Sequence, residues 1–344
     1  MPGPRYITAL APIRICDCGG WSDTWFAGHG QVCHVAVAPY VEVQVAAEAR
    51  RPGEPRVVVH AENYGTRYVP DPGDPAHSPH PLIDAAIAHM GVPEDFAIEV
   101  TIYSDMPGGA STGTSASLTV ALVGALDALT PGRLTPLEAA YTAHAIEVDR
   151  LGRQSGIQDQ ICAAIGGISF LDIRPYPQAR VEPVALADET RWNLERRLLL
   201  VYLGRTHDSS VVHREVIARL ERDRAARAPL DTIRASAVAA RDALVAGNLD
   251  RLGLAMQAAT EGQAALHPAL VSREARTLIG LASSHGAVGW KVNGAGGDGG
   301  SLTLLTGPSA PQRRALTAAI AAAGEGWQVV PIHLARQGLR VWEG

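Results

Sequence analysis

The alternation of apolar and polar residues divides the first half of the chain into predicted strands and helices. Strands are predicted where β-branched residues alternate with polar ones, and helices where apolar residues recur every three or four positions. Prolines in residues 70–81 predict a surface loop, followed by a short helix that ends at Gly91. The predicted strands are 32–48, 56–60, 96–104 and 166–173, and the predicted helices are 114–129, 136–151 and 157–165.

The second half begins after the proline-bearing segment 174–183 and alternates helix and strand to the C-terminus. A strand is predicted over 196–204, followed by Ala- and Arg-rich helices at 208–227 and 231–246. A chain of 344 residues exceeds the usual size of one domain, so two domains are expected, with a ligand cleft between them.

Composition narrows the classes of function. With 47% hydrophobic and 19% charged residues, the chain is globular, and a net charge of −5 without a long basic run argues against nucleic-acid binding. We expect a cytoplasmic protein without a membrane segment, because no signal-peptide pattern or long apolar run is present. The four cysteines lack CxxC spacing, which argues against zinc, and Cys16 and Cys18 are interpreted as packing residues.

The first candidate for chemistry is PGGASTGTSAS, residues 107–117, where a predicted strand ends and a helix begins. Free amides and the positive end of the helix dipole make such a junction an anion site, and its hydroxyls suit phosphate or magnesium. A helix capped by one Ser or Thr is the structural alternative. The common P-loop is excluded because GxxxxGK[ST] is absent from the chain.

The second candidate is AIEVDRLGRQSGIQDQICAAIGG, residues 145–167, with Glu147 and Asp159 on either side of a glycine-containing turn. Phosphoryl transfer to a sugar hydroxyl needs one carboxylate to accept or orient the proton and another to hold magnesium. The alternative is that both acids are capping or solvated residues near helix ends.

Two further stretches have glycine turns. KVNGAGGDGGSLTLL, residues 291–305, fits G-x-G-x-x-G. A dinucleotide-binding site requires a helix after the glycines, but a strand pattern follows, so we reject that site. We interpret the stretch as a tight turn near a bound ligand. APIRICDCGGWSDTWFAGHG, residues 11–30, places Trp21 and Asp23 in a loop, where a ring and a carboxylate suit a sugar. Core packing of Trp21 and a turn role for Asp23 remain alternatives.

In chain order, residues 11–24, 107–117 and 291–300 resemble the first, second and third motifs of the GHMP kinase superfamily, and the resemblance covers most of the chain. GGWSDT resembles L-fucokinases, and the segments around 146–167 and 266–297 resemble D-glycero-D-manno-heptose 7-phosphate kinases, which favours the sugar kinases. The resemblance implies an α+β fold with a domain like domain 2 of ribosomal protein S5 at 1–175, a ferredoxin-like domain at 176–344, and ATP and substrate in the cleft between them.

The resemblance also assigns roles to residues, with ATP and Mg²⁺ as cofactors. Asp159 is the implied catalytic acid, Arg14 its neighbour, and Ser115 and Glu147 the magnesium ligands. The implied triphosphate loop is Pro107, Gly108, Gly109, Ala110, Ser111, Thr112, Gly113, Thr114 and Ser115. The implied substrate residues are Gly19, Gly20, Trp21, Asp23, Gly294, Ala295 and Gly296, with His207, Thr206 and Ser209 as further candidates.

The expected reaction is phosphorylation of a sugar or sugar phosphate, at the anomeric hydroxyl by analogy with fucose and galactose kinases, by a monomer or homodimer. Ser111-Thr112 departs from the family's Gly-Leu, and Asp298 interrupts the third motif. Asp298 would repel a phosphorylated substrate unless Arg153 or Lys291 offsets it. A non-catalytic sugar and ATP sensor and a mevalonate-type kinase or decarboxylase remain alternatives.

Overall fold

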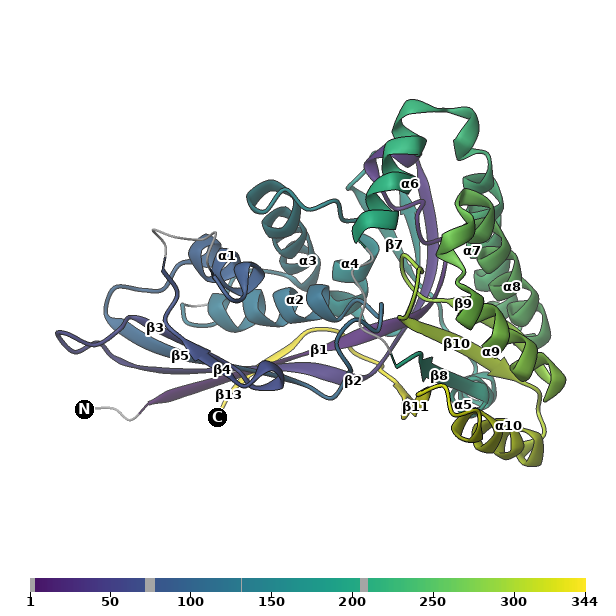
Figure 1. Cartoon of the computed structure of the whole chain (residues 1–344). Coiled ribbons are helices and arrows are strands. Elements are labelled where there is room, and N and C mark those ends of the chain that lie inside the picture. Colours follow the sequence, from purple (N-terminus) through teal and green to yellow (C-terminus); the bar gives the residue numbers. More distant parts are fainter. Residues whose placement is uncertain (1–3, 72–77, 131, 205–209) are drawn as a thin grey trace.

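The computed structural model describes residues 4–71, 78–130, 132–204 and 210–344, which form two sheets with helices packed on them (Figure 1). The larger sheet has nine strands within these residues, and most neighbours in it are antiparallel. Its main order is β13 (Arg340–Glu343), β1 (Arg5–Cys18), β2 (Gly30–Ala49), β5 (Phe96–Ser104), β3 (Val57–Ala61) and β4 (Thr66–Tyr68), with β6 (Ile168–Ile173), β7 (Ala179–Pro183) and β12 (His333–Leu334) joined to it.

Four helices cover one face of the first part of this sheet (Figure 1). Helix α2 lies directly on β1 and β2, and its residues Ser117 and Thr119–Leu126 are all buried, as expected of a helix enclosed on every side. The four helices are α1 (Pro81–Met90), α2 (Thr114–Asp127), α3 (Pro136–Ala145) and α4 (Gln158–Ile165).

The smaller sheet is antiparallel, with strand order β11 (Gln328–Val330), β8 (Leu198–Tyr202), β10 (Ser301–Thr306) and β9 (Ala287–Val292). One apolar cluster joins its inner side to the end of β1, because Ile13 and Ile15 pack with residues such as Leu200 and Met256. The helices of this part are α5 (Asp188–Arg197), α6 (Ser210–Arg222), α7 (Pro229–Val245), α8 (Leu249–Leu266), α9 (Arg273–Ser284) and α10 (Ala310–Ala322).

Strand β1 connects the two parts. Its side chains alternate between buried and half-exposed up to Leu10, and every residue from Ala11 to Cys18 is buried. This change in burial occurs where β1 is covered by α7 and α8 as well as by α4. The first motif therefore lies between two packed layers at the end of a long strand.

The structure confirms the mixed fold and differs from the sequence prediction in three segments. The helix predicted over 136–151 ends at Ala145 and continues as a π-helical turn, Ile146–Arg150. Helix α5 was missed because its sequence is polar and buries only Leu194 and Arg197. The C-terminal segment returns to the first sheet, where β13 pairs with β1, so the division at residue 175 stays a prediction.

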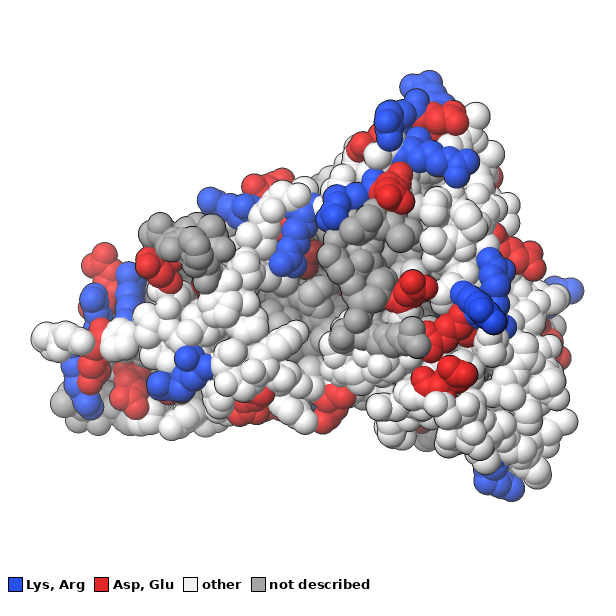
Figure 2. Space-filling model, in the orientation of Figure 1, with Lys and Arg blue, Asp and Glu red and all other residues white. Residues whose placement is uncertain are grey.

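Two features of the structure concern binding to a membrane or to nucleic acid. No helix in the described part of the chain is long and apolar enough to cross a membrane. On the face shown in Figure 2, basic and acidic side chains are interspersed and no broad basic area forms.

Candidate active site

The predicted phosphate loop, residues 107–115, joins β5 to α2. The N-terminus of α2 has no side-chain cap. The N-cap residue Gly113 has φ +73° and no side chain accepts a hydrogen bond from the first turn. The capped-helix alternative is thus excluded, and the amides of the first turn are left for another acceptor. Ser115 lies exposed in this first turn.

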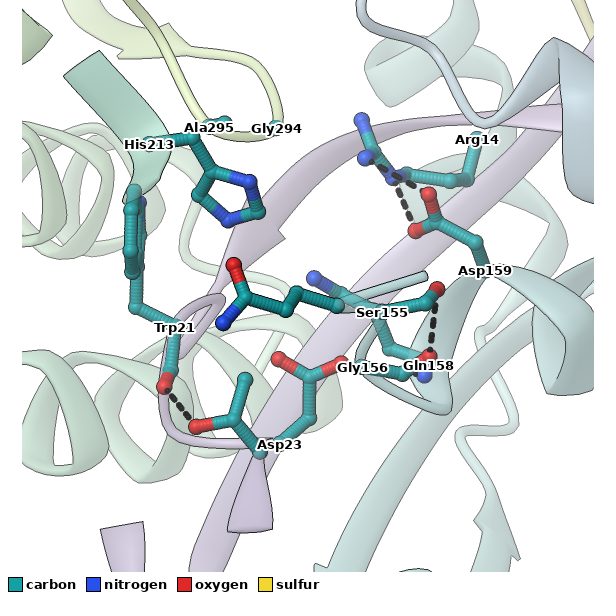
Figure 3. A pocket seen from close by; sticks show the side chains of 12 residues that line it. Arg14, Trp21, Asp23, Ser155, Gly156, Gln158, Asp159, His213, Gly294 and Ala295 are labelled. Atoms are coloured by element: carbon teal, nitrogen blue, oxygen red, sulfur yellow. Dashed lines mark hydrogen bonds and ion pairs between the residues drawn. The ribbon is translucent and has the colours of Figure 1, made fainter. Parts of the chain in front are cut away.

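Arg14 of β1 and Asp159 of α4 form a two-pronged ion pair (Figure 3). Arg14 Nε donates to Asp159 Oδ1 at 2.8 Å and Nη2 donates to Oδ2 at 3.1 Å. Burial by itself would lower the pKa of Arg14, but the negative charges of Asp159 and Asp17 raise this pKa overall. The guanidinium is therefore a fixed positive charge on the predicted catalytic carboxylate.

The three glycine motifs meet at this ion pair. A Cβ atom at Gly113 would lie 3.2 Å from the Asp159 carboxylate, and one at Gly294 would lie 3.1 Å from Arg14 Nη2. Arg14 Nη1 also donates to the Ser111 carbonyl at 2.5 Å. Arg14 and Asp159 thus lie in direct contact with both the predicted phosphate loop and the turn at Gly294.

Ser111 and Thr112, which stand where the family has Gly-Leu, pack against other parts of the protein. Ser111 has φ +58°, a conformation that favours glycine, and its side chain lies against Gly294 and Gly300. Thr112 is 1% exposed, and its carbonyl accepts from the Arg14 amide at 2.9 Å. These residues therefore connect the loop to β1 and the third motif.

A cavity of about 140 Å³ opens beside Asp159 (Figure 3). Residues from 11–30, 145–167 and 291–305 line it, together with one residue of α6. The lining residues are Arg14, Trp21, Asp23, Thr24, Gln154, Ser155, Gly156, Gln158, Asp159, His213, Gly294 and Ala295.

Asp23 contributes a second, buried carboxyl to this cavity. One oxygen accepts from the Gln158 amide at 3.1 Å, and the side chain is pressed against Gly156, where a Cβ would collide with it. Burial raises the pKa of Asp23 to about 6. At neutral pH it is mostly ionised and accepts hydrogen bonds.

Trp21 and His213 form the other wall. Their rings meet edge to face with centroids 5.0 Å apart. Burial, with a smaller effect of Arg214, lowers the pKa of His213, so its ring is neutral at pH 7. Trp21 is 6% exposed, and its Nε1–H has no hydrogen-bond partner among the described residues.

Behind Arg14, a buried charge network ties the first motif to the third. Asp17 is fully buried and lies 3.4 Å from Lys291 Nζ and 4.0 Å from Arg14 Nη1. Its Oδ2 accepts from the Gly294 amide at 3.0 Å, and Gln263 bonds both Lys291 and the Gly294 carbonyl. This network holds the third-motif turn beside Arg14.

Glu147 lies in the π-helical turn and is buried. Burial raises its pKa to about 7. Its Oε2 accepts from Gln160 at 3.2 Å, whereas Oε1 has no hydrogen-bond partner in the described chain. A buried carboxylate oxygen without a partner fits a cation ligand. No group of three or more His, Cys, Asp or Glu among the described residues could hold a metal alone.

A second cavity, of about 420 Å³, lies at the start of the phosphate loop. Pro107, Gly108 and Thr114 of the loop line it together with Asn63 and Tyr64. The Asn63 side chain is fixed by two hydrogen bonds with the Ser104 backbone, of 2.6 and 2.8 Å. The loop therefore borders both this cavity and the Asp159 site.

Several predicted substrate residues lie outside the first cavity. Gly19 and Gly20 form the turn beside it, and a Cβ at Gly20 would lie 2.8 Å from Asp17 Oδ2. Gly296 is closed in by the Leu270 carbonyl, and Asp298 is exposed and does not line the cavity. The candidates Thr206, His207 and Ser209 lie outside the described residues.

Sequence reasoning missed Asp17, Gln158 and His213. Gln158 directly precedes the predicted acid in GIQDQ, and His213 ends the stretch 204–213 in which other residues were chosen. Asp17 alternates with cysteines in β1, so its pattern resembled that of a core strand.

Comparisons with known proteins show similarity in sequence and in fold. Residues 82–167 match the model of the GHMP kinases N terminal domain. The bifunctional fucokinase/GDP-fucose pyrophosphorylase of Arabidopsis thaliana is 25% identical over 88% of this chain and 30% of that protein. The D-glycero-alpha-D-manno-heptose 7-phosphate kinase of Campylobacter jejuni is 25% identical over 60% of each chain. A mevalonate kinase of Methanothermobacter thermautotrophicus is 30% identical over 61% of this chain and 65% of that protein.

The chain thus spans less than two thirds of the length of these relatives. A crystal structure of a D-glycero-D-manno-heptose 1-phosphate kinase from Bacteroides thetaiotaomicron superposes with a TM-score of 0.74 at 19% identity, over 98% of both chains. Residues 82–167 therefore match the N-terminal domain of GHMP kinases, and nearly the whole chain shares the fold of this heptose phosphate kinase.

Proposed function

We propose that this protein transfers the γ-phosphoryl group of ATP to a hydroxyl of a sugar or sugar phosphate, a hexose or a heptose, with the anomeric hydroxyl as acceptor. The observation that carries the proposal is the contact between Asp159, paired with Arg14, and the uncapped phosphate loop at Gly113. It brings a proton acceptor to the place where a phosphate would bind.

In the proposed reaction, Asp159 accepts or orients the proton of the sugar hydroxyl, whose oxygen attacks the γ-phosphorus in line while the bond to the ADP oxygen breaks. Arg14 holds the Asp159 carboxylate through two hydrogen bonds and stabilises charge on the attacking oxygen. Loop amides stabilise the phosphoryl oxygens, and the second cavity offers space for the nucleoside.

The residues present fit magnesium. Glu147 Oε1 and the exposed Ser115 hydroxyl would hold it, leaving the other coordination positions to phosphate oxygens and water. When bound, magnesium supplies positive charge that neutralises the triphosphate.

The cavity favours a sugar over mevalonate. Mevalonate carries a carboxylate, and the cavity places a second carboxyl, Asp23, beside Asp159. Among the described residues that line it, Arg14 is the one charged base, and it is already paired with Asp159, whereas His213 is neutral.

The test is a screen of free hexoses, heptoses and their phosphates with ATP and magnesium. We expect sugar-dependent ADP release, with phosphorus NMR of the product identifying the phosphorylated hydroxyl. Sugar and ATP binding without ADP release across the panel would instead support a non-catalytic sensor.

A further inference from the structure

Among the described residues that line the cavity beside Asp159, negative charges outnumber positive ones. Arg14 and Asp159 neutralise each other through two hydrogen bonds. Asp23 is a further carboxyl, and among the described residues it forms no ion pair. His213 stands opposite as a neutral ring, because burial lowers its pKa.

Two buried, uncharged polar atoms in residues that line the cavity lack partners among the described residues. Trp21 Nε1 is a donor and Gln158 Oε1 an acceptor, and both side chains belong to residues that are 6% exposed and line the cavity. Buried polar groups without partners are costly unless a ligand or water satisfies them. One donor, one neutral acceptor and one carboxylate together match a ligand rich in hydroxyl groups.

Among the described residues, the two cations considered for a phosphate substituent, Lys291 and Arg153, lie outside the cavity lining. Lys291 is 3% exposed, bound to Asp17 and Gln263, and absent from the cavity lining. Arg153 is exposed and also does not line the cavity. A phosphate placed in the cavity would therefore meet Asp23 without an unpaired cation among the lining residues.

We propose that this cavity selects an unphosphorylated, neutral sugar, whose hydroxyls bind Trp21 Nε1–H, the Gln158 side-chain oxygen and the Asp23 carboxylate. This inference rests on the proposed kinase function and narrows its substrate class. Trp21 and Gln158 determine affinity for hydroxyls, and Asp23 determines discrimination against an anionic substituent.

The first experiment measures binding without nucleotide. Each free sugar of the panel is compared with its own phosphate by calorimetry on the full chain, and turnover is measured separately with ATP. We expect the free sugar to bind at least about tenfold more tightly than its phosphate. A sugar phosphate that binds more tightly than its free sugar would overturn the inference even if ADP release upholds the kinase.

The second experiment changes single groups. Asp23→Asn keeps an acceptor but removes the charge, so the preference for free sugar should fall about tenfold. Trp21→Phe keeps a ring but removes the donor, and should raise the sugar Kd about three- to tenfold with ATP affinity unchanged. Trp192→Phe, at a ring that is 63% exposed on α5, is the control.

The two proposals fail separately. Preferred binding of a free sugar without ADP release supports the cavity assignment and contradicts the kinase. Unchanged discrimination in Asp23→Asn contradicts the cavity assignment whatever the turnover. The absence of binding by every free and phosphorylated sugar contradicts it as well.

Discussion

Gly113 of the phosphate loop lies directly against Asp159, because a Cβ atom at Gly113 would stand 3.2 Å from its carboxylate. Gly113→Ala would add that atom at φ +73°, a conformation that costs an alanine about 1–2 kcal/mol. We expect kcat to fall about ten- to a hundredfold as Asp159 is displaced. Gly91→Ala is the matched control, since Gly91 also has φ +73° but its Cβ would meet nothing within 4 Å, and equal losses of kcat in both variants would contradict this reasoning.

Asp159→Asn tests the proton acceptor. Asparagine can still accept a hydrogen bond from Arg14 but cannot take a proton, so kcat should fall about 10²- to 10⁴-fold. ATP affinity, measured by displacement of a fluorescent nucleotide, should stay within about twofold. Turnover equal to that of the unaltered protein would remove Asp159 from the mechanism.

The elements around the site could largely be predicted from sequence because their signals are local. The turn at Gly108–Gly113 and the apolar run after Ser115 predict the start of α2 within one segment. The π-helical turn Ile146–Arg150 was not predicted, since its sequence, IEVDR, continues the helical pattern of α3.

The rest depends on contacts between distant segments. Asp17 and Gly294 are 277 positions apart, and neither pattern indicates that they meet. His213 reaches the cavity only because α6 packs near Trp21, and β13 returns to β1 from the end of the chain. These three contacts result from tertiary packing, which a local sequence pattern does not specify.

Ser111→Gly should stabilise the protein slightly. Relief of the left-handed conformation is worth about 1–2 kcal/mol, and the greater freedom of glycine in the unfolded chain offsets about 0.5–1 kcal/mol of it. Urea unfolding should show a gain of about 0–1.5 kcal/mol with activity retained. Ser111→Ala removes the hydroxyl but keeps the strain, so a gain there would show that strain is not the cause.

The buried pair of Asp17 and Lys291 should show strong coupling. Asp17→Asn or Lys291→Met alone leaves one charge unpaired and should cost about 3–5 kcal/mol of unfolding free energy. The double variant should lose less than the sum, because neither charge is then stranded. The exposed pair Arg67 and Glu99 is the control, where a coupling of about 0–1 kcal/mol is expected. Additive losses at Asp17 and Lys291 would contradict the network.

Asp23 should make the stability of the ligand-free protein depend on pH. Burial raises its pKa from 3.8 to about 6, so between these values the folded chain holds a proton that the unfolded chain has released. Its contribution to stability is therefore present below pH 4 and is lost as the pH rises through 6. The unfolding free energy of Asp23→Asn, relative to the unaltered protein, should rise by up to about 3 kcal/mol between pH 4 and pH 7. Asp298→Asn removes an exposed carboxyl and is the control. A stability difference between Asp23→Asn and the unaltered protein that is the same at both pH values would show that Asp23 is not held in a buried, proton-binding environment.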